Sequence, residues 1–141
     1  MGRRAVAAVL GMLALAGCDN ANELKASMTG PQERPTPVVS GGTGEAKANV
    51  KGNTVVVAGV FDNLTSTAIA AHIHGPADKD TAAPVLCGLT VTASSANGTS
   101  GTIGGTCDFS DAQIEQLKDG QTYINVHTQN YPDGEIRGQL E

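Results

Sequence analysis

The sequence predicts an all-β protein, an antiparallel Greek-key-like sandwich or barrel with one short helix at about Ser110 to Lys118. Short segments of alternating apolar and polar residues recur at intervals of roughly 8–12 residues, separated by residues that favour turns. Val, Ile and Thr, which favour strands, are frequent, and one segment alone has the spacing of an amphipathic helix. Regularly spaced short strands with little helix are typical of antiparallel sandwiches and barrels.

The first seventeen residues have the character of an export signal. Two arginines precede an apolar stretch at residues 5–16, which is too short for the ~20 residues that a membrane span needs. Leu15-Ala16-Gly17-Cys18 then resembles the lipobox of bacterial lipoproteins, which implies that Cys18 carries lipid. An ordinary signal peptide with a chance cysteine is the alternative. We expect a signal peptide at 1–17, a lipidated tether at 18–22 and a domain at 23–141, exported and anchored to a bacterial cell membrane on its periplasmic or outer face.

Composition limits the partners of the mature chain. Without residues 1–17 about 124 residues remain, enough for one domain. Their net charge changes from −5 to about −7 because two arginines are lost, and an acidic surface argues against nucleic acid or anionic lipid as a partner. The chain has no Trp, 2 Tyr and 2 Phe, so its core gains little from aromatic burial.

Cys87 and Cys107 are the two cysteines left once Cys18 carries lipid. Thiols of an exported chain meet an oxidising compartment, so we expect these two to form a disulfide. Closing a loop of about 20 residues stabilises a fold by about 3 kcal/mol through the lost entropy of the unfolded chain. Two free buried thiols, or a copper thiolate that uses either cysteine, are the alternatives.

The first half of the domain predicts three strands. Residues 23–29 alternate, with their apolar side chains on one face. The proline-rich segment 30–37 then interrupts the sheet, because proline cannot pair within a central strand. Residues 44–50 and 54–61 are joined by Lys51-Gly52-Asn53, a hairpin signal. Both faces of 54–61 are apolar, which indicates a central strand.

The second half predicts further strands and the helix. The helix begins at Ser110 and Gln113, which fit a capping box, and ends at Asp119-Gly120. Alternation and turn residues predict strands at 67–74, 83–92, 98–108, 121–128 and 135–140. In the first of these, Ile69, Ala71 and Ile73 share the face that is expected to point into the core.

All three histidines of the chain lie in two of the predicted strands. His72 and His74 are two residues apart, so a strand directs both imidazoles to the same, outward face. Ile124 and Val126 are the core-facing residues of the later strand, so His127 also points outward. If the two strands are neighbours, three nitrogen ligands converge on one patch, which is a metal-site geometry. Three ordinary surface histidines that lie together by chance are the alternative.

Three sequence blocks resemble the signature of the CHRD domain, which is named after chordin and is widespread in secreted bacterial proteins and lipoproteins. The blocks are Ala71-His72-Ile73-His74-Gly75-Pro76-Ala77, Tyr123-Ile124-Asn125-Val126-His127-Thr128 and Asp133-Gly134-Glu135-Ile136-Arg137-Gly138-Gln139-Leu140. Residues 24–33 resemble the start of the family as well, although Arg34-Pro35-Thr36-Pro37 replaces its tighter double proline. The resemblance covers residues 23–140 and implies an extracytoplasmic β-sheet module, with no defined molecular role.

The histidine pattern is also similar to that of copper-zinc superoxide dismutases, where a His-x-His strand and a later Val-His strand hold copper in a Greek-key barrel. His72, His74 and His127 match those ligands in order. The chain has no fourth histidine to match the one that bridges copper and zinc. A copper ion is therefore the expected ligand, with zinc as the alternative, because copper(II) binds more tightly than zinc at equal geometry.

Hydrogen bonds from neighbouring groups normally orient imidazoles that bind a metal. Glu135, expected to lie cross-strand from His127, is the candidate for this role, and Arg137 or Asn125 are candidates to assist it. A plain ion pair between Glu135 and Arg137 on an exposed face, worth under about 1 kcal/mol, is the alternative.

These observations lead to three hypotheses for the function. The first is a lipid-anchored, non-enzymatic binding module that holds a copper ion through the three histidines for storage, delivery or sensing. The second is a dismutase-like copper redox enzyme in which Arg137 steers an anion to the metal. The third is a metal-free structural or adhesive module of the cell envelope. Nucleophilic catalysis is disfavoured, because no serine or cysteine lies in a nucleophile elbow and no paired carboxylates stand out.

Overall fold

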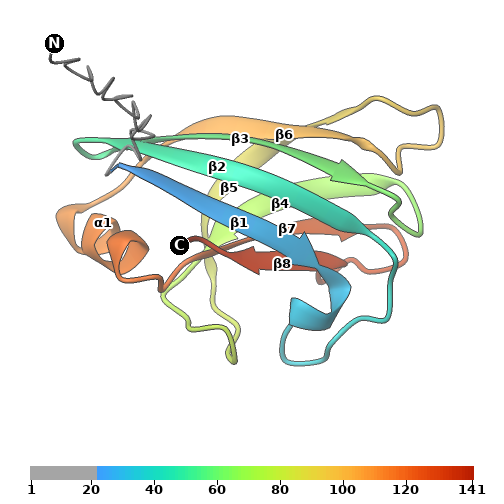
Figure 1. Ribbon diagram of the computed structural model, residues 1–141, viewed down its shortest axis with the longest axis horizontal. Helices are drawn as coiled ribbons and strands as arrows, with labels where there is room; N and C mark the ends of the chain where they lie inside the picture. Colours follow the sequence, from blue (N-terminus) through green and yellow to red (C-terminus); the bar gives the residue numbers. More distant parts are fainter. Residues whose placement is uncertain (1–21) are drawn as a thin grey trace, which may run out of the picture.

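Eight strands, each antiparallel to its neighbours, close into a barrel in residues 22–141, the part of the chain that the computed structural model describes (Figure 1). The strands are β1 (Glu23–Thr29), β2 (Thr43–Lys51), β3 (Thr54–Asp62), β4 (Ala68–His74), β5 (Val85–Ala93), β6 (Gly101–Asp108), β7 (Tyr123–Thr128) and β8 (Ile136–Gln139). Around the barrel their order is β1-β2-β3-β6-β5-β4-β7-β8, and the pair Thr29–Arg137 joins β8 to β1. The chain crosses two strands between β3 and β4, and again between β6 and β7, which confirms the predicted Greek-key connections.

The helix α1 (Asp111–Lys118) begins where the sequence predicts it. Ser110 and Gln113 form the capping box, because the Ser110 hydroxyl accepts the backbone N–H of Gln113 and the Gln113 side chain accepts that of Ser110. Ile114 and Leu117 pack into the core, and α1 lies at the end of the barrel where β1 begins (Figure 1). Within residues 22–141, every helix falls short of the length and apolar character that a membrane crossing requires. The expected signal peptide and Cys18 lie outside the described residues.

Alternate residues of the strands fill the barrel interior, as the pattern predicts. The residues of this core include Ala26, Met28, Ala46, Ala48, Val55, Val57, Phe61, Ile103, Ile124, Val126, Ile136 and Leu140. β3 pairs on both sides, with β2 and β6, which confirms it as a central strand. Its second apolar face is nevertheless not buried, since Val56 and Val60 are 47% and 55% exposed. A closed barrel pairs every strand twice and still leaves its outer face to solvent.

The predicted disulfide joins Cys87 of β5 to Cys107 of β6, with the Cα atoms 6.1 Å apart. The paired part of these strands runs from Thr90–Gly104 to Ala93–Gly101, and the same register extended along both strands places the two cysteines opposite each other. The bond therefore joins β5 and β6 beyond the point where their hydrogen-bonded pairing stops. Neither sulfur is a free thiolate, which removes the copper-thiolate alternative.

Loops cover the outer face of β4, β7 and β8, and the expectation that this face is exposed is wrong. Glu135 is 0% exposed, Arg137 1% and His127 7%. The covering segments are residues 30–42, between β1 and β2, and residues 75–84, between β4 and β5. Alternation along a strand separates its two faces, but it cannot show that a long connection folds back over the outer one.

One residue of β4 departs from the predicted alternation. Ala71 and Ile73 are buried in the core as expected, whereas Ile69 is 51% exposed. The pairing of β4 with β7 shifts register between Ala68 and Ala70, and a shift of this kind changes which face a side chain points to. From Ala70 to His74 the pairing is regular, so the two histidines of β4 keep the predicted arrangement.

Candidate metal centre

The three histidines meet on the covered outer face of two neighbouring strands. β4 supplies His72 and His74 and β7 supplies His127, with Ala70 opposite His127 and His72 opposite Asn125. One nitrogen from each ring lies within 4.8 Å of the other two. The ring centroids of His72 and His127 are 4.7 Å apart, and those of His74 and His127 are 6.0 Å apart. The convergence predicted from the spacing is therefore present.

Two backbone carbonyls fix the tautomers of His74 and His127. His74 Nδ1 lies 2.9 Å from the carbonyl oxygen of Ala83, and His127 Nδ1 lies 2.8 Å from that of Pro132. A carbonyl only accepts hydrogen bonds, so both Nδ1 atoms carry the proton. Each Nε2 is then unprotonated and carries a lone pair, the form in which imidazole binds a metal.

His72 makes direct contact with His127. His72 Nδ1 lies 2.9 Å from His127 Nε2, and because the latter is unprotonated, His72 Nδ1 donates the hydrogen bond. Two ligands at 2.0–2.1 Å from one metal lie roughly 2.9 Å apart when they subtend a right angle, and roughly 3.3 Å apart in a tetrahedron. The two nitrogens are therefore already as close together as two ligands of one metal. A metal would replace the shared proton.

Burial keeps the three imidazoles neutral. His74 and His127 are 8% and 7% exposed, and His72 is partly exposed. Burial lowers the pKa of all three from 6.5, and it outweighs the carbonyl bonds of His74 and His127, which raise the pKa. At neutral pH the rings are therefore free of the second proton that would block a metal.

The ring of Tyr123 contacts both His74 and Arg137. The imidazole of His74 stacks on the ring with centroids 4.9 Å apart and an interplanar angle of 3°. The guanidinium of Arg137 lies 3.5 Å from the same ring centroid. Because β7 lies between β4 and β8, the two groups approach Tyr123 from opposite neighbouring strands.

Arg137 anchors the covering loop rather than facing the histidines. Its guanidinium donates to the carbonyl oxygens of Asp78 and Thr81, both at 2.7 Å, and to the Gln139 side chain at 3.2 Å. The segment it holds, residues 75–84, includes Ala83, whose carbonyl orients His74. Arg137 therefore supports the site through this loop, and the exposed ion pair with Glu135 is absent.

The expectation that Glu135 orients His127 is wrong. The Glu135 carboxylate accepts hydrogen bonds from the backbone N–H of Thr65, at 3.0 and 3.1 Å, and from the Thr65 hydroxyl. The partner of His127 is instead the Pro132 carbonyl. A backbone carbonyl carries no signal in the sequence, because every residue has one.

Asn125 lies opposite His72 on the neighbouring strand, and Glu33, which sequence reasoning missed, lies beside it. Glu33 is 3% exposed and belongs to the segment between β1 and β2. Burial raises the pKa of Glu33 to about 7, although Arg137 and Asn125 lower it. The one sequence signal for Glu33 was its place in residues 24–33, which resemble the start of the CHRD domain. That resemblance says nothing about the burial of its side chain.

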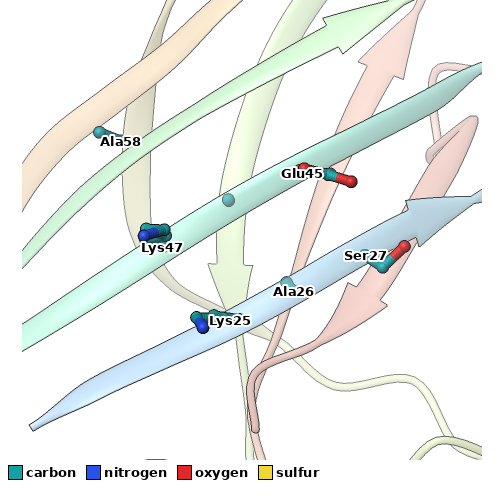
Figure 2. A pocket seen from close by; sticks show the side chains of 7 residues that line it. Lys25, Ala26, Ser27, Glu45, Lys47 and Ala58 are labelled. Atoms are coloured by element: carbon teal, nitrogen blue, oxygen red, sulfur yellow. The ribbon is translucent and has the colours of Figure 1, made fainter. Parts of the chain in front are cut away.

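Two of the surface hollows of the described chain show where a ligand could enter. One, of about 540 Å³, adjoins the metal centre and is lined by residues 33–39 and 130–134. The other, of about 410 Å³, lies over β1 and β2, where Lys25 and Lys47 point outward on adjacent strands (Figure 2). Lys47 pairs with Glu23 at 3.2 Å, and this second hollow contains none of the predicted site residues.

A Greek-key barrel with three imidazoles under a loop cover defines an antiparallel β module with a candidate metal centre. The CHRD domain family matches residues 24–140, nearly all of the described chain, so the chain belongs to the CHRD domain family. This confirms the resemblance seen in the sequence blocks. No match was found among curated proteins or among solved structures.

Proposed function

We propose that this CHRD domain is a non-enzymatic binding module that holds one copper ion through His72 Nδ1, His74 Nε2 and His127 Nε2. The observation that carries the proposal is the tautomer pattern: two carbonyls accept hydrogen bonds from the far nitrogens of His74 and His127, so the near nitrogen of each ring is unprotonated. Surface histidines that gather by chance have no reason to be oriented and partly buried in this way.

Copper(II) is the ion that the donor set favours. Three neutral imidazole nitrogens bind copper(II) more tightly than zinc(II) at equal geometry. Zinc(II), which also binds imidazole nitrogens, is the second choice.

The proposal includes a location outside the cytoplasm, with the chain anchored by lipid at Cys18. The lipobox-like Leu15-Ala16-Gly17-Cys18 supports it, and the Cys87–Cys107 disulfide is typical of an oxidising compartment. Expression with a labelled fatty acid tests it, with Cys18→Ser as the control. Label in the wild type and none in the variant is the expected result, and equal label in both contradicts the anchor.

The enzymatic alternative gains no support from Arg137. Its guanidinium is 1% exposed and bonded to backbone carbonyls, so it is not placed to draw an anion from solvent to the metal. Storage, delivery or sensing requires only binding and release, which three neutral nitrogens under a loop cover provide.

Titration of residues 22–141 with copper(II) and zinc(II) tests the proposal, beside His72→Ala, His74→Ala and His127→Ala. We expect one equivalent of copper to bind the wild type with a Kd below micromolar and at least tenfold more weakly to each variant. A Gln121→Ala variant, at an exposed residue next to β7, is the control. Equal binding by the wild type and the three histidine variants would contradict the proposal.

A further inference from the structure

Three buried side-chain atoms near the metal centre have no hydrogen-bond partner in the described chain. They are His74 Nε2, Asn125 Oδ1 and Glu33 Oε1. Buried polar atoms in native proteins almost always have a partner, so an unpaired group of three needs an explanation. A bound metal explains His74 Nε2 alone. It leaves the oxygen of Asn125 unexplained.

Asn125 lies between the other two residues. It is paired with His72 across β4 and β7, so its side chain lies on the same outer face as those of His72 and His74. A Cβ built on Gly134 would lie 2.6 Å from Asn125 Nδ2 and 2.6 Å from Glu33 Oε1, so these two atoms border the same small space. The amide nitrogen thus faces Glu33, and Gly134 leaves them room.

This orientation turns the amide oxygen toward the histidines. Asn125 Nδ2, rather than Oδ1, borders the space beside Glu33 Oε1, and the carboxyl group of Glu33 has an oxygen that can accept a hydrogen bond from it whether or not it is protonated. Asn125 Oδ1 and His74 Nε2 then face each other as two acceptors, an arrangement that is unfavourable unless a donor or a cation lies between them. A metal that carries a water molecule supplies both: the cation for His74 and the donor for Asn125.

We propose that Asn125, oriented by Glu33, is a positioning residue whose Oδ1 accepts a hydrogen bond from the water that completes the coordination of the metal. The inference rests on the proposed function. It adds the Asn125 side-chain oxygen to the three nitrogen ligands as a group that binds the metal-bound water. It also explains the buried carboxyl group of Glu33 as the group that orients the Asn125 amide.

The test compares copper(II) and zinc(II) binding by the wild type and by variants of the two residues. Asn125→Leu keeps the shape and removes the acceptor, and we expect its Kd for zinc(II) to rise about tenfold or more. Asn125→Asp keeps an oxygen beside the metal, so we expect its Kd to match or fall below that of the wild type. A purely structural role for Asn125 predicts the opposite for aspartate, because a second buried carboxylate disturbs packing.

Two further variants complete the test. Glu33→Gln retains an acceptor for the amide and is expected to bind within about threefold of the wild type, whereas Glu33→Leu is expected to weaken binding about as much as Asn125→Leu. Thr122→Val is the matched control, because the Thr122 hydroxyl is also buried and unpaired, yet no contact links it to the three histidines. Its Kd is expected to stay within about twofold. Folding of every variant is checked by thermal unfolding, and the Glu33 variants decide the matter if Asn125→Leu does not fold.

The outcomes separate this inference from the proposed function. If the histidine variants lose metal binding while Asn125→Leu and Glu33→Leu keep the wild-type Kd, the inference is overturned. The proposed metal site is then still supported. Absence of metal binding by the wild type would overturn both. In copper(II)-loaded wild type, exchange into D₂O is expected to change the pulsed electron paramagnetic resonance signal of a coordinated water, and no change would also overturn the inference.

Discussion

His72 Nδ1 lies 2.9 Å from His127 Nε2, with His127 held from behind by the carbonyl of Pro132. In the metal-free protein this contact is a hydrogen bond that occupies one lone pair of the site with a proton. Metal binding must break it, and His72, the most exposed of the three rings, must move its proton to Nε2. Metal binding and the tautomer of His72 are therefore coupled.

Metal affinity should be insensitive to pH above about 6.5, the ordinary pKa of histidine. Burial lowers the pKa of all three imidazoles, so protons compete with the metal only at lower pH. We expect the Kd for zinc(II) to be constant between pH 8 and about 6.5 and to rise steeply below about 6. Competition with a chromophoric chelator measures it. A roughly sevenfold loss of affinity between pH 8 and 6.5, which three rings with the ordinary pKa of about 6.5 would give, would show that the rings titrate as ordinary surface histidines.

Glu33 should make the metal-free domain less stable as the pH rises. Burial raises the pKa of Glu33 from 4.5 to about 7, so between these values the folded state holds a proton that the unfolded state has lost. The stabilisation is complete below pH 4.5 and is lost as the pH rises through about 7. Glu33→Gln cannot titrate, so its stability relative to the wild type should increase from pH 5 to 8 by about 1–3 kcal/mol. Urea unfolding at both values measures this, and a constant difference would contradict it.

Arg137→Met should destabilise the domain by about 3 kcal/mol. The substitution removes the guanidinium from the Tyr123 ring and leaves the carbonyls of Asp78 and Thr81 without their donor. Lys79→Met is the control, because the Lys79 side chain is 80% exposed and its ion pair with Asp80 at 3.2 Å is worth under about 1 kcal/mol. Urea unfolding compares the two. If both substitutions lower the free energy of unfolding by a similarly small amount, Arg137 stabilises the domain no more than a surface residue does.

Reduction of the disulfide should lower the free energy of unfolding by about 3 kcal/mol. The bond between Cys87 and Cys107 closes a loop with a sequence separation of 20 and joins β5 to β6 where their ladder stops. Denaturant unfolding with and without reductant measures the loss, with a Cys87→Ala, Cys107→Ala variant as the non-reducible control. If reductant also destabilises that variant, the loss cannot be assigned to the bond.

Periodicity and turn chemistry were sufficient to predict the strands and the helix. The hairpin of residues 44–61 depends on a local signal at Gly52, whose φ of +60° suits glycine, and α1 depends on the capping pair Ser110–Gln113. The spacing of His72 and His74 fixed their common face for the same reason, since alternation is a local property of a strand.

Burial of the outer face could not be predicted in this way. It arises because residues 30–42 and 75–84 fold over β7 and β8, and their contacts are distant in sequence: Arg137 with Thr81, Glu33 with Asn125, His74 with Ala83. For the same reason Glu135 was assigned to His127 when its true partner is Thr65. Loop contacts made through backbone carbonyls leave no pattern of residue types.

The most direct test of the account is to record the ¹⁵N chemical shifts of the three imidazoles by nuclear magnetic resonance, before and after one equivalent of zinc(II). Before zinc, we predict protonated Nδ1 atoms in all three rings. After zinc, we predict that the metal-bound nitrogens are Nδ1 of His72 and Nε2 of His74 and His127, with the proton of His72 moved to Nε2. Shifts that do not change on addition of zinc, or that change in fewer than three rings, would contradict the proposed metal centre.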